Sequence, residues 1–265
     1  MDDVLLVAHE GAVLRVTMNR PDVRNAFNDA LIQALIEAFT AAATDPSVRC
    51  VVLAGAGKAF CAGADLAWMK SMAQHGEADN ARDARRLAGL FEAVDRCPKP
   101  VIGRIQGAAM GGGVGLVACC DIPVATEDAS FAFTEVRLGL APAVISPFVV
   151  RKIGVGAARE LFVTGERFDA ERARALGLVN HLAADEAALD ATVDRLAAAI
   201  VAGAPGAVAA CKQLALTVGE LDREQATTET AALIARLRAG AEGQEGMRAF
   251  LTRTPPAWTR TEDRG

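Results

Sequence analysis

A glycine-rich apolar run is the part of this sequence best suited to bind a reacting group through its backbone. Between Arg104 and Asp121 lie 16 uncharged residues. Five of them are glycines: Gly107, Gly111, Gly112, Gly113 and Gly115. Such a run predicts a tight turn that leads into a buried helix, whose first N–H groups lack intrahelical partners and carry partial positive charge. An anionic oxygen would bind well there. A closely packed core helix is the alternative interpretation.

Other ligand classes fit this run poorly. A membrane-spanning helix needs about 20 apolar residues, whereas this run is shorter and crowded with glycine. A dinucleotide fingerprint would need G-x-G-x-x-G after a strand, followed by an acidic partner for the ribose, and neither is found. The stretch Gly55-Ala56-Gly57-Lys58 resembles the end of a phosphate-binding loop only superficially, because the Ser or Thr after the lysine is missing.

A second run of small residues and one acidic residue could complete a reactive site. Residues 59–66 read Ala-Phe-Cys-Ala-Gly-Ala-Asp-Leu and lead into a predicted short helix, so their backbone could also contact a ligand. Glu135 lies at a predicted strand-to-loop boundary among apolar neighbours, where partial desolvation would bring its acidity closer to the range useful for proton transfer. A structural ion pair between Glu135 and Arg137 is the alternative.

Charged residues at two further places could contact a ligand. Arg20 and Arg24 lie in a predicted loop, residues 19–27, and could face phosphates, or the loop could be an ordinary charged one. Residues 71–83 are polar and predicted to be irregular, which favours a mobile lid over a pocket.

Composition excludes several function classes. The net charge is 28 − 33 = −5, so the chain as a whole has no nucleic-acid-binding signature. The six cysteines form no C-x-x-C pair and only three histidines are present, so neither a metal site nor a disulfide framework is expected. Buried thiols in a reducing cytosol are the better interpretation. The start of the chain has no basic segment followed by an apolar one, which predicts a cytoplasmic protein without a secretory signal.

The elements that must position these groups alternate between strands and helices up to about residue 200, which indicates an α/β fold. Strands are predicted over residues 4–8, 12–18, 49–55, 101–105, 121–125, 129–134 and 178–182. Helices are predicted over residues 29–43, 65–70, 82–97, 143–153, 156–163 and 170–176. Beyond residue 185 the chain is predicted to be alanine-rich helix to about residue 253, interrupted near residues 203–206. Helices of this kind often pack against another subunit, and the final residues are predicted to be disordered.

Three motifs in this sequence resemble those of the crotonase, or enoyl-CoA hydratase/isomerase, superfamily. They are residues 59–66, residues 107–113 and the Glu-Val-Arg-Leu-Gly of residues 135–139. The resemblance implies a spiral of repeated β-β-α turns over residues 1–200 that holds the CoA-ester site. It implies a helical oligomerisation region over residues 201–265, which assembles a homotrimer or a hexamer of two trimers. The implied ligand is an acyl-CoA thioester, with no metal and no cofactor beyond the coenzyme A of the substrate itself.

The resemblance also implies roles for individual residues. The backbone N–H groups of Ala64 and Gly112 would form an oxyanion hole, and Glu135 would be the catalytic acid/base. Such N–H donors stabilise the enolate formed when water adds to an α,β-unsaturated thioester or when its double bond moves, each contributing roughly 3 kcal/mol. The positions matched to coenzyme A binding are Arg24, Ala26, Ala62, Asp65, Leu66, Phe250 and Arg253, of which the last two would reach a neighbouring subunit's coenzyme A.

One position departs from the pattern of the hydratases. These enzymes usually carry a second glutamate after the glycine run, and this sequence has Gly115 there. A single glutamate resembles the Δ3,Δ2-enoyl-CoA isomerases, and a binding protein without catalysis is a third possibility. However, residues 60–70 and 134–147 are similar to bacterial methylglutaconyl-CoA and isohexenylglutaconyl-CoA hydratases of leucine and terpene breakdown. Hydration is therefore the expected reaction, with Ser146 or a lid residue as candidates to assist water. Candidates to bind a distal carboxylate are Lys70, Arg82 and Arg86.

Overall fold

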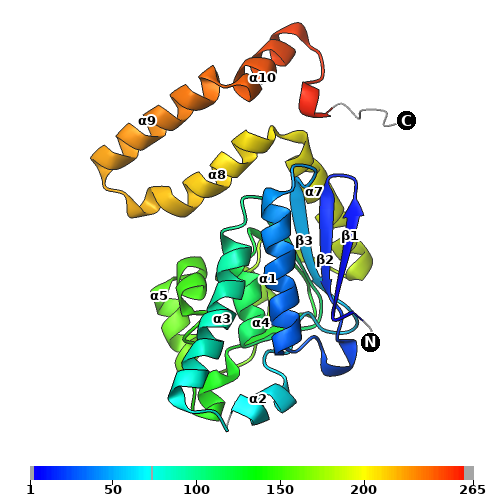
Figure 1. Ribbon diagram of the computed structural model, residues 1–265, viewed down its shortest axis with the longest axis vertical. Coiled ribbons are helices and arrows are strands. Elements are labelled where there is room, and N and C mark those ends of the chain that lie inside the picture. The colour runs from blue at the N-terminus through cyan, green and yellow to red at the C-terminus, as the bar shows by residue number, and fades with distance from the viewer. Residues whose placement is uncertain (1–2, 73, 260–265) are drawn as a thin grey trace.

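Two β-sheets form the framework of the protein. The computed structural model describes residues 3–72 and 74–259 (Figure 1). The larger sheet has the strand order β1 (Leu5–Glu10), β2 (Val13–Met18), β3 (Cys50–Gly55), β4 (Val101–Ile105), β6 (Ile122–Thr126) and β9 (His181–Ala183). Only the β1–β2 hairpin is antiparallel in this sheet. The smaller sheet has the order β5 (Ala108–Met110), β7 (Ser130–Ala132) and β8 (Phe168–Asp169).

Successive stretches of chain add one strand to each sheet and then a helix. β4 in the larger sheet is followed by β5 in the smaller sheet and by α4 (Gly112–Cys119). β6 and β7 repeat the pattern and lead into a 3-10 helix, η2 (Thr134–Leu138), and α5 (Ser146–Thr164). An isolated parallel bridge between Cys61 and Ala109 places the segment after β3 beside β5 as well. This arrangement confirms the predicted spiral of β-β-α turns.

Helices cover both faces of the larger sheet. Along β3 the buried side chains alternate, so that Val51 and Leu53 pack toward one hydrophobic cluster, and Cys50 and Val52 toward another. The first cluster includes α1 (Asp29–Thr44), α3 (Glu77–Asp95) and α4, whereas the second includes α7 (Glu186–Ala202) (Figure 1). α1 begins as predicted, because the Asn28 side chain accepts a hydrogen bond from the Leu31 N–H.

The last helices form a layer at one end of the molecule. The remaining helices are α2 (Leu66–Met72), α6 (Ala170–Ala175), α8 (Pro205–Thr217), α9 (Arg223–Ala239) and α10 (Ala241–Thr252). α8 and α9 contain no buried residue, and α10 contains only Ala249, so this layer has little core of its own. Figure 1 places α9 and α10 at the end of the molecule opposite α2. Within the described residues, no single helix is long and apolar enough to span a membrane; only residues 186–202 and 205–220 together pass, bent by 111°.

Several predicted boundaries were wrong. Residues 77–83, predicted to be part of an irregular lid, are the first turns of α3, where Glu77 and Asp79 favour the positive end of the helix dipole. The two helices predicted over residues 143–153 and 156–163 are confirmed, because α5 is broken into two helical segments at Gly154, where φ is 77°; only the start differs, at Ser146. The strand predicted from residue 178 begins at residue 181. Part of the predicted disordered tail, residues 260–265, lies outside the described residues. Just before it, Trp258 packs back on the molecule, because its Nε1 donates to the Ala202 carbonyl oxygen at 3.1 Å.

Candidate active site

One carboxyl oxygen of Glu135 is buried and has no hydrogen-bond partner within the described residues. Glu135 lies in η2, directly after β7, and this oxygen is its Oε2 atom. Burial raises the pKa of Glu135 above the usual value of 4.5. The alternative ion pair with Arg137 is not formed, because Arg137 Nε donates to the Gly165 carbonyl oxygen at 3.2 Å and no salt bridge joins the two side chains. Glu135 therefore has the environment of a proton-transfer group.

The start of α4 lies against this carboxyl group. Gly111 has φ of 50° and ψ of −119°, and a Cβ atom at that position would be 3.1 Å from Glu135 Oε1. The Gly111 N–H donates to the Ala132 carbonyl oxygen at 2.8 Å, whereas the Gly112 N–H has no acceptor among residues 3–72 and 74–259. The free N–H of Gly112 and the carboxyl of Glu135 are therefore on adjacent backbone segments.

A second free N–H group comes from Ala64. Ala64 forms an isolated parallel bridge with Phe27, in which the Phe27 N–H donates to Gly63 O at 2.7 Å and the Asp65 N–H donates to Phe27 O at 2.9 Å. Because neighbouring peptide groups in an extended chain alternate in direction, the Ala64 N–H points away from Phe27. No acceptor for it is found in the described chain.

Glycines bring these two backbone segments together. Met110 N–H donates to the Cys61 carbonyl oxygen at 2.9 Å, which fixes the segment before Ala64 beside the turn before Gly112. A Cβ atom on Gly113 would be 2.4 Å from the Cys61 oxygen, and one on Gly63 would be 2.9 Å from the Met110 oxygen. Only glycine permits such close approach. Both small-residue runs therefore lead into a helix, as predicted, and the fold brings them side by side. The role of the Ala64 and Gly112 N–H groups in binding an oxyanion stays a prediction.

The residues predicted to bind coenzyme A fall into two separate groups. Ala62 N–H donates to the Arg24 carbonyl oxygen at 2.9 Å, so the loop with Arg24 and Ala26 lies against the segment that continues to Asp65 and Leu66. Arg24 is exposed and has φ of 52°. Phe250, which is 84% exposed, and Arg253 lie on and just after α10, far from α2 in Figure 1. Within one chain, Phe250 and Arg253 therefore cannot contact a ligand bound beside Arg24 and Leu66 (Figure 1).

Arg20 is not available to a phosphate, contrary to one of the two predicted interpretations. Its guanidinium donates to the Ala26 carbonyl oxygen and, at 2.8 Å, to Asp65 Oδ2. Asn25 is fully buried with φ of 56°, and its Nδ2 donates to Ala56 O at 2.9 Å and to Ala59 O at 2.8 Å. The sequence analysis did not identify Asn25, although asparagine is among the residues that most often adopt positive φ.

The remaining candidates pair with residues other than Glu135 or are exposed. Arg82 pairs with Asp79 at 2.6 Å and Arg86 with Asp29 at 3.0 Å. Ser146 Oγ donates to the Ala143 carbonyl oxygen at 2.8 Å, and Lys70 is exposed. None of these contacts joins the residue to Glu135. No group of three or more potential metal ligands is found among the described residues.

Apolar side chains fill the space where a second acidic side chain, at position 115, would lie. A Cβ atom on the buried Gly115 would be 2.3 Å from Ile145 Cγ2 and 2.9 Å from Phe91 Cε1. The Phe91 ring also packs at 6.3 Å against Phe27 and at 6.0 Å against Phe148, measured between centroids. The packing in this region therefore excludes any side chain at position 115.

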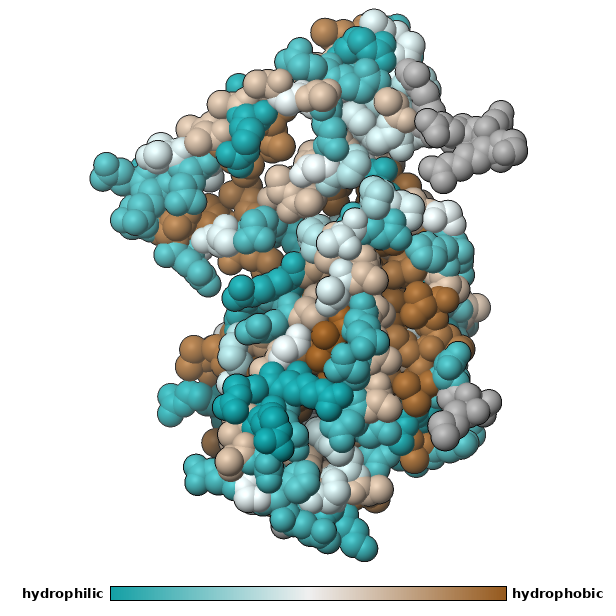
Figure 2. All heavy atoms as spheres, in the orientation of Figure 1, coloured by the Kyte–Doolittle hydropathy of each residue, from teal (hydrophilic) through white to brown (hydrophobic). Residues whose placement is uncertain are grey.

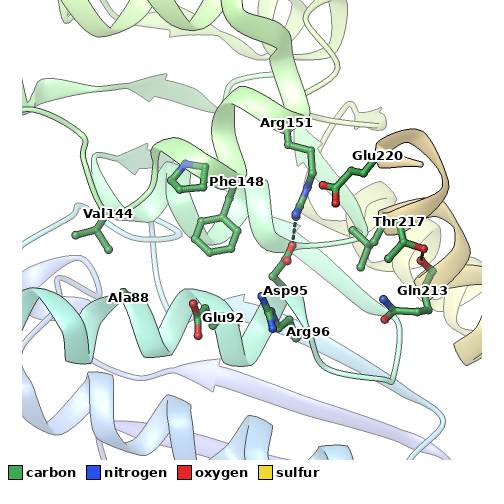
Figure 3. Close-up of a pocket in the computed structure, with 12 residues that line it drawn as sticks. Ala88, Glu92, Asp95, Arg96, Val144, Phe148, Arg151, Gln213, Thr217 and Glu220 are labelled. Atoms are coloured by element: carbon green, nitrogen blue, oxygen red, sulfur yellow. Dashed lines mark hydrogen bonds and ion pairs between the residues drawn. The ribbon is translucent and has the colours of Figure 1, made fainter. Parts of the chain in front are cut away.

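A separate cavity lies between α3, the start of α5 and the α8 region. It has a volume of about 510 Å³, and Figure 3 shows the ion pair between Asp95 and Arg151 on its wall. None of the predicted site residues lines it. It belongs to the junction between the spiral and the C-terminal helices rather than to the site around Glu135.

Replacement of Gly111 by alanine should disturb the carboxyl group directly. The new methyl group would lie 3.1 Å from Glu135 Oε1 and would occupy a backbone conformation that favours glycine, at a cost of about 1–3 kcal/mol. We expect kcat for the reaction proposed below to fall roughly tenfold to hundredfold, because small misplacements of reacting groups are costly. Steady-state kinetics would measure this. Gly177→Ala is the matched control, since Gly177 has φ of 80° but only an ordinary contact, so it should lose stability without losing kcat.

Burial of Glu135 also predicts a pH-dependent effect on stability. Its pKa in the folded protein is raised, so the folded state holds the proton at pH values where the unfolded chain has released it. The contribution of Glu135 to the free energy of unfolding is therefore highest below about pH 4.5. It decreases as the pH rises through the raised pKa of the folded protein. Glu135→Gln should have a higher melting temperature than the wild type at pH 8, and the difference should shrink toward pH 4. A difference independent of pH would contradict this.

Comparisons with known proteins agree with this fold. A family model described as enoyl-CoA hydratase/isomerase matches residues 8–261. A 2,3-dehydroadipyl-CoA hydratase of Escherichia coli is 33% identical over 253 residues that cover 95% of this chain and 97% of that protein. A crystal structure of an enoyl-CoA hydratase from Shewanella pealeana superposes with a TM-score of 0.93 at 38% identity, covering 96% of both chains. The structure of AtuE from Pseudomonas aeruginosa gives 0.92 at 38% identity, covering 97% of this chain and 100% of that one.

Proposed function

Because this chain belongs to the enoyl-CoA hydratase/isomerase family, we propose that it adds water to an α,β-unsaturated acyl-CoA thioester. The observation that carries the proposal is the buried, unpaired carboxyl oxygen of Glu135 beside the free N–H group of Gly112. A carboxyl group and a free helix-start N–H on adjacent segments are the two parts needed to form and protonate an enolate.

The proposed reaction uses one carboxylate twice. The thioester oxygen accepts hydrogen bonds from the N–H groups of Ala64 and Gly112, which draws electrons from the double bond. Glu135 takes a proton from water while the water oxygen bonds to the β-carbon, and the charge moves to the thioester oxygen as an enolate. The protonated Glu135 then gives its proton to the α-carbon, which restores the thioester carbonyl and completes the addition of H and OH.

We propose a substrate with a distal carboxylate, such as a methylglutaconyl-CoA-like thioester. Support comes from the local similarity of residues 60–70 and 134–147 to hydratases of such substrates, and from a relative named for a dehydroadipyl thioester. Among the three candidate cations, Lys70 is exposed and has no acidic partner within the described residues, whereas Arg82 and Arg86 pair with aspartates.

A Δ3,Δ2-enoyl-CoA isomerase is the second candidate, and one observation favours it. Moving a double bond requires one carboxylate to carry a proton from one carbon to another, and the packing of Ile145 and Phe91 against Gly115 leaves Glu135 as the one matched acid. Both reactions would use the same enolate and the same N–H groups. They differ in whether water is incorporated.

A single assay separates these reactions. The absorbance of the conjugated thioester would be followed with 3-methylglutaconyl-CoA and with crotonyl-CoA as substrates. The products would be identified by mass spectrometry. Loss of absorbance with the gain of one water supports hydration. Conversion of a 3-enoyl-CoA to a 2-enoyl-CoA without added water supports the isomerase, and binding without turnover of any of these thioesters would indicate a non-catalytic protein.

We also propose that the C-terminal helices assemble a homotrimer, or a hexamer of two trimers. Apolar side chains on α9 and α10 remain uncovered in the single chain: Ile234, Met247, Phe250 and Leu251. Figure 2 shows apolar surface between α8 and α9 in the same layer. In such an assembly, Phe250 and Arg253 would reach a neighbouring chain's coenzyme A, since α10 lies at the end of the molecule opposite α2 (Figure 1). Light scattering of the purified protein would give the number of chains.

A further inference from the structure

The direction of the Ala64 N–H group depends on a bridge between two distant segments. That bridge consists of the two hydrogen bonds between Phe27 and the residues on either side of Ala64. If Phe27 shifted relative to residues 63–65, the peptide before Ala64 would rotate and its N–H would turn from its present direction. Whatever holds these segments in register therefore also aims this donor.

The guanidinium of Arg20 joins the two segments. One of its nitrogens donates to the carbonyl oxygen of Ala26, directly before Phe27, and another donates to Asp65 Oδ2, directly after Ala64, at 2.8 Å. The Arg20 and Asp65 side chains are only 18% and 10% exposed, so this ion pair is little screened by water. Arg20 thus closes a clamp around the bridge.

Both partners of the clamp are fixed by further contacts. Asp65 Oδ1 accepts hydrogen bonds from the N–H groups of Ala67 at 2.8 Å and Trp68 at 3.3 Å, which caps the start of α2. Burial alone would raise the pKa of Asp65, but Arg20 and these N–H groups outweigh it and hold the pKa below its usual range. The backbone N–H of Arg20 donates to Asn25 Oδ1 at 2.9 Å. The Asp65 carboxyl group is therefore ionised at neutral pH, and each partner of the clamp has at least one further hydrogen bond that holds it in place.

We propose that Arg20 and Asp65 are positioning residues, which orient the Ala64 N–H for stabilising an enolate oxygen. This inference rests on the proposed function, in which that N–H group is half of the oxyanion hole. It assigns the Asp65 side chain a role in orienting the oxyanion hole, whereas the family resemblance matched Asp65 only to a position along coenzyme A. Neither side chain touches the substrate in this account.

The inference is tested with a ligand that reports enolate stabilisation without turnover. Acetoacetyl-CoA has an acidic α-carbon, and its enolate absorbs in the near ultraviolet, so the apparent pKa of the bound ligand measures the strength of the oxyanion hole. We expect Arg20→Gln to raise that pKa by about one to two units, which is a tenfold to hundredfold weaker stabilisation, with kcat reduced by a similar factor. Affinity for the thioester should change much less.

Three further variants separate positioning from general damage. Asp65→Asn keeps an oxygen to cap α2 but removes the ion pair, so it should match Arg20→Gln, and the double variant should be no worse than either. Arg20→Lys keeps the charge without the two-pronged geometry and should be intermediate. Arg104→Gln is the matched control, because Arg104 is 13% exposed and pairs with Glu186 and Asp190 away from the site. It should lower the melting temperature without moving the pKa of the bound ligand.

The outcomes are distinct. If wild-type protein shifts the acetoacetyl-CoA pKa but Arg20→Gln behaves like Arg104→Gln, the positioning role is overturned while the proposed function stands. If wild-type protein shifts the pKa but hydrates no enoyl thioester, the proposed reaction fails and the role of Arg20 is still decided by the variants. If wild-type protein does not shift the pKa at all, both the oxyanion hole and the clamp are overturned.

Discussion

Replacement of Glu135 by glutamine should lower kcat for enoyl-CoA hydration by about 10² to 10⁴-fold while leaving the affinity for the CoA ester close to that of the wild type. Glutamine fills the same space beside Gly111 but cannot accept a proton from water or return one to carbon. Because Oε2 has no hydrogen-bond partner in the described chain, the amide would break no existing contact there. Steady-state kinetics and equilibrium binding of a substrate analogue would measure the two effects separately.

Glu127→Gln is the control for this experiment. Glu127 is an exposed glutamate in the turn between β6 and β7, one strand before Glu135, and its loss should leave kcat unchanged. Wild-type kcat/KM should also fall as pH decreases through the raised pKa of Glu135, because the carboxylate must be ionised to accept the proton from water. Full activity of Glu135→Gln would remove the assignment of this residue as the acid/base.

The candidate site could be predicted from the sequence to the extent that it consists of backbone. An N–H group that contacts a ligand at a crowded turn requires small residues around it, and this requirement leaves a visible pattern around Ala64 and Gly112. Glu135 was identifiable because a carboxylate among apolar residues is unusual. The alternation of predicted strands and helices indicated only an α/β fold, and the spiral of β-β-α turns was implied by the family resemblance of these motifs.

The contacts that orient these groups could not be predicted in this way. Arg20 and Asp65 are 45 residues apart, and nothing in either local sequence indicates that they pair. The sequence left two interpretations of Arg20 open, a phosphate-facing residue and a member of an ordinary charged loop, because a loop arginine suits both. The start of α3 was missed for a related reason, since acidic residues favour a helix start as well as an irregular surface segment. Tertiary contacts decide such cases, and a single sequence does not contain them.

Introducing a glutamate at position 115 should destabilise the fold by at least about 4 kcal/mol rather than add a second catalytic acid. A methyl group alone, in Gly115→Ala, would have to lie 2.3 Å from Ile145 Cγ2, and such overpacking costs about 1–3 kcal/mol. Glutamate adds a buried carboxyl group with no partner among the surrounding apolar side chains. Thermal unfolding should place Gly115→Glu below Gly115→Ala, and both below the wild type.

Combining Gly115→Ala with Ile145→Ala tests whether this packing is the cause. The Ile145→Ala change alone opens a cavity at a cost of about 2–5 kcal/mol, but it also removes Cγ2, so that the nearest remaining atoms to the new methyl group are Phe91 Cε1 at 2.9 Å and the residue 145 Cβ at 3.0 Å. The double variant should therefore lose less stability than the sum of the two single variants. Gly89→Ala is the control, because Gly89 lies inside α3 with nothing within 4 Å of its Cβ position and should gain about 0.5–1 kcal/mol. If Gly115→Ala melted like the wild type, the space would be open, and the single-carboxylate site would need an explanation other than packing.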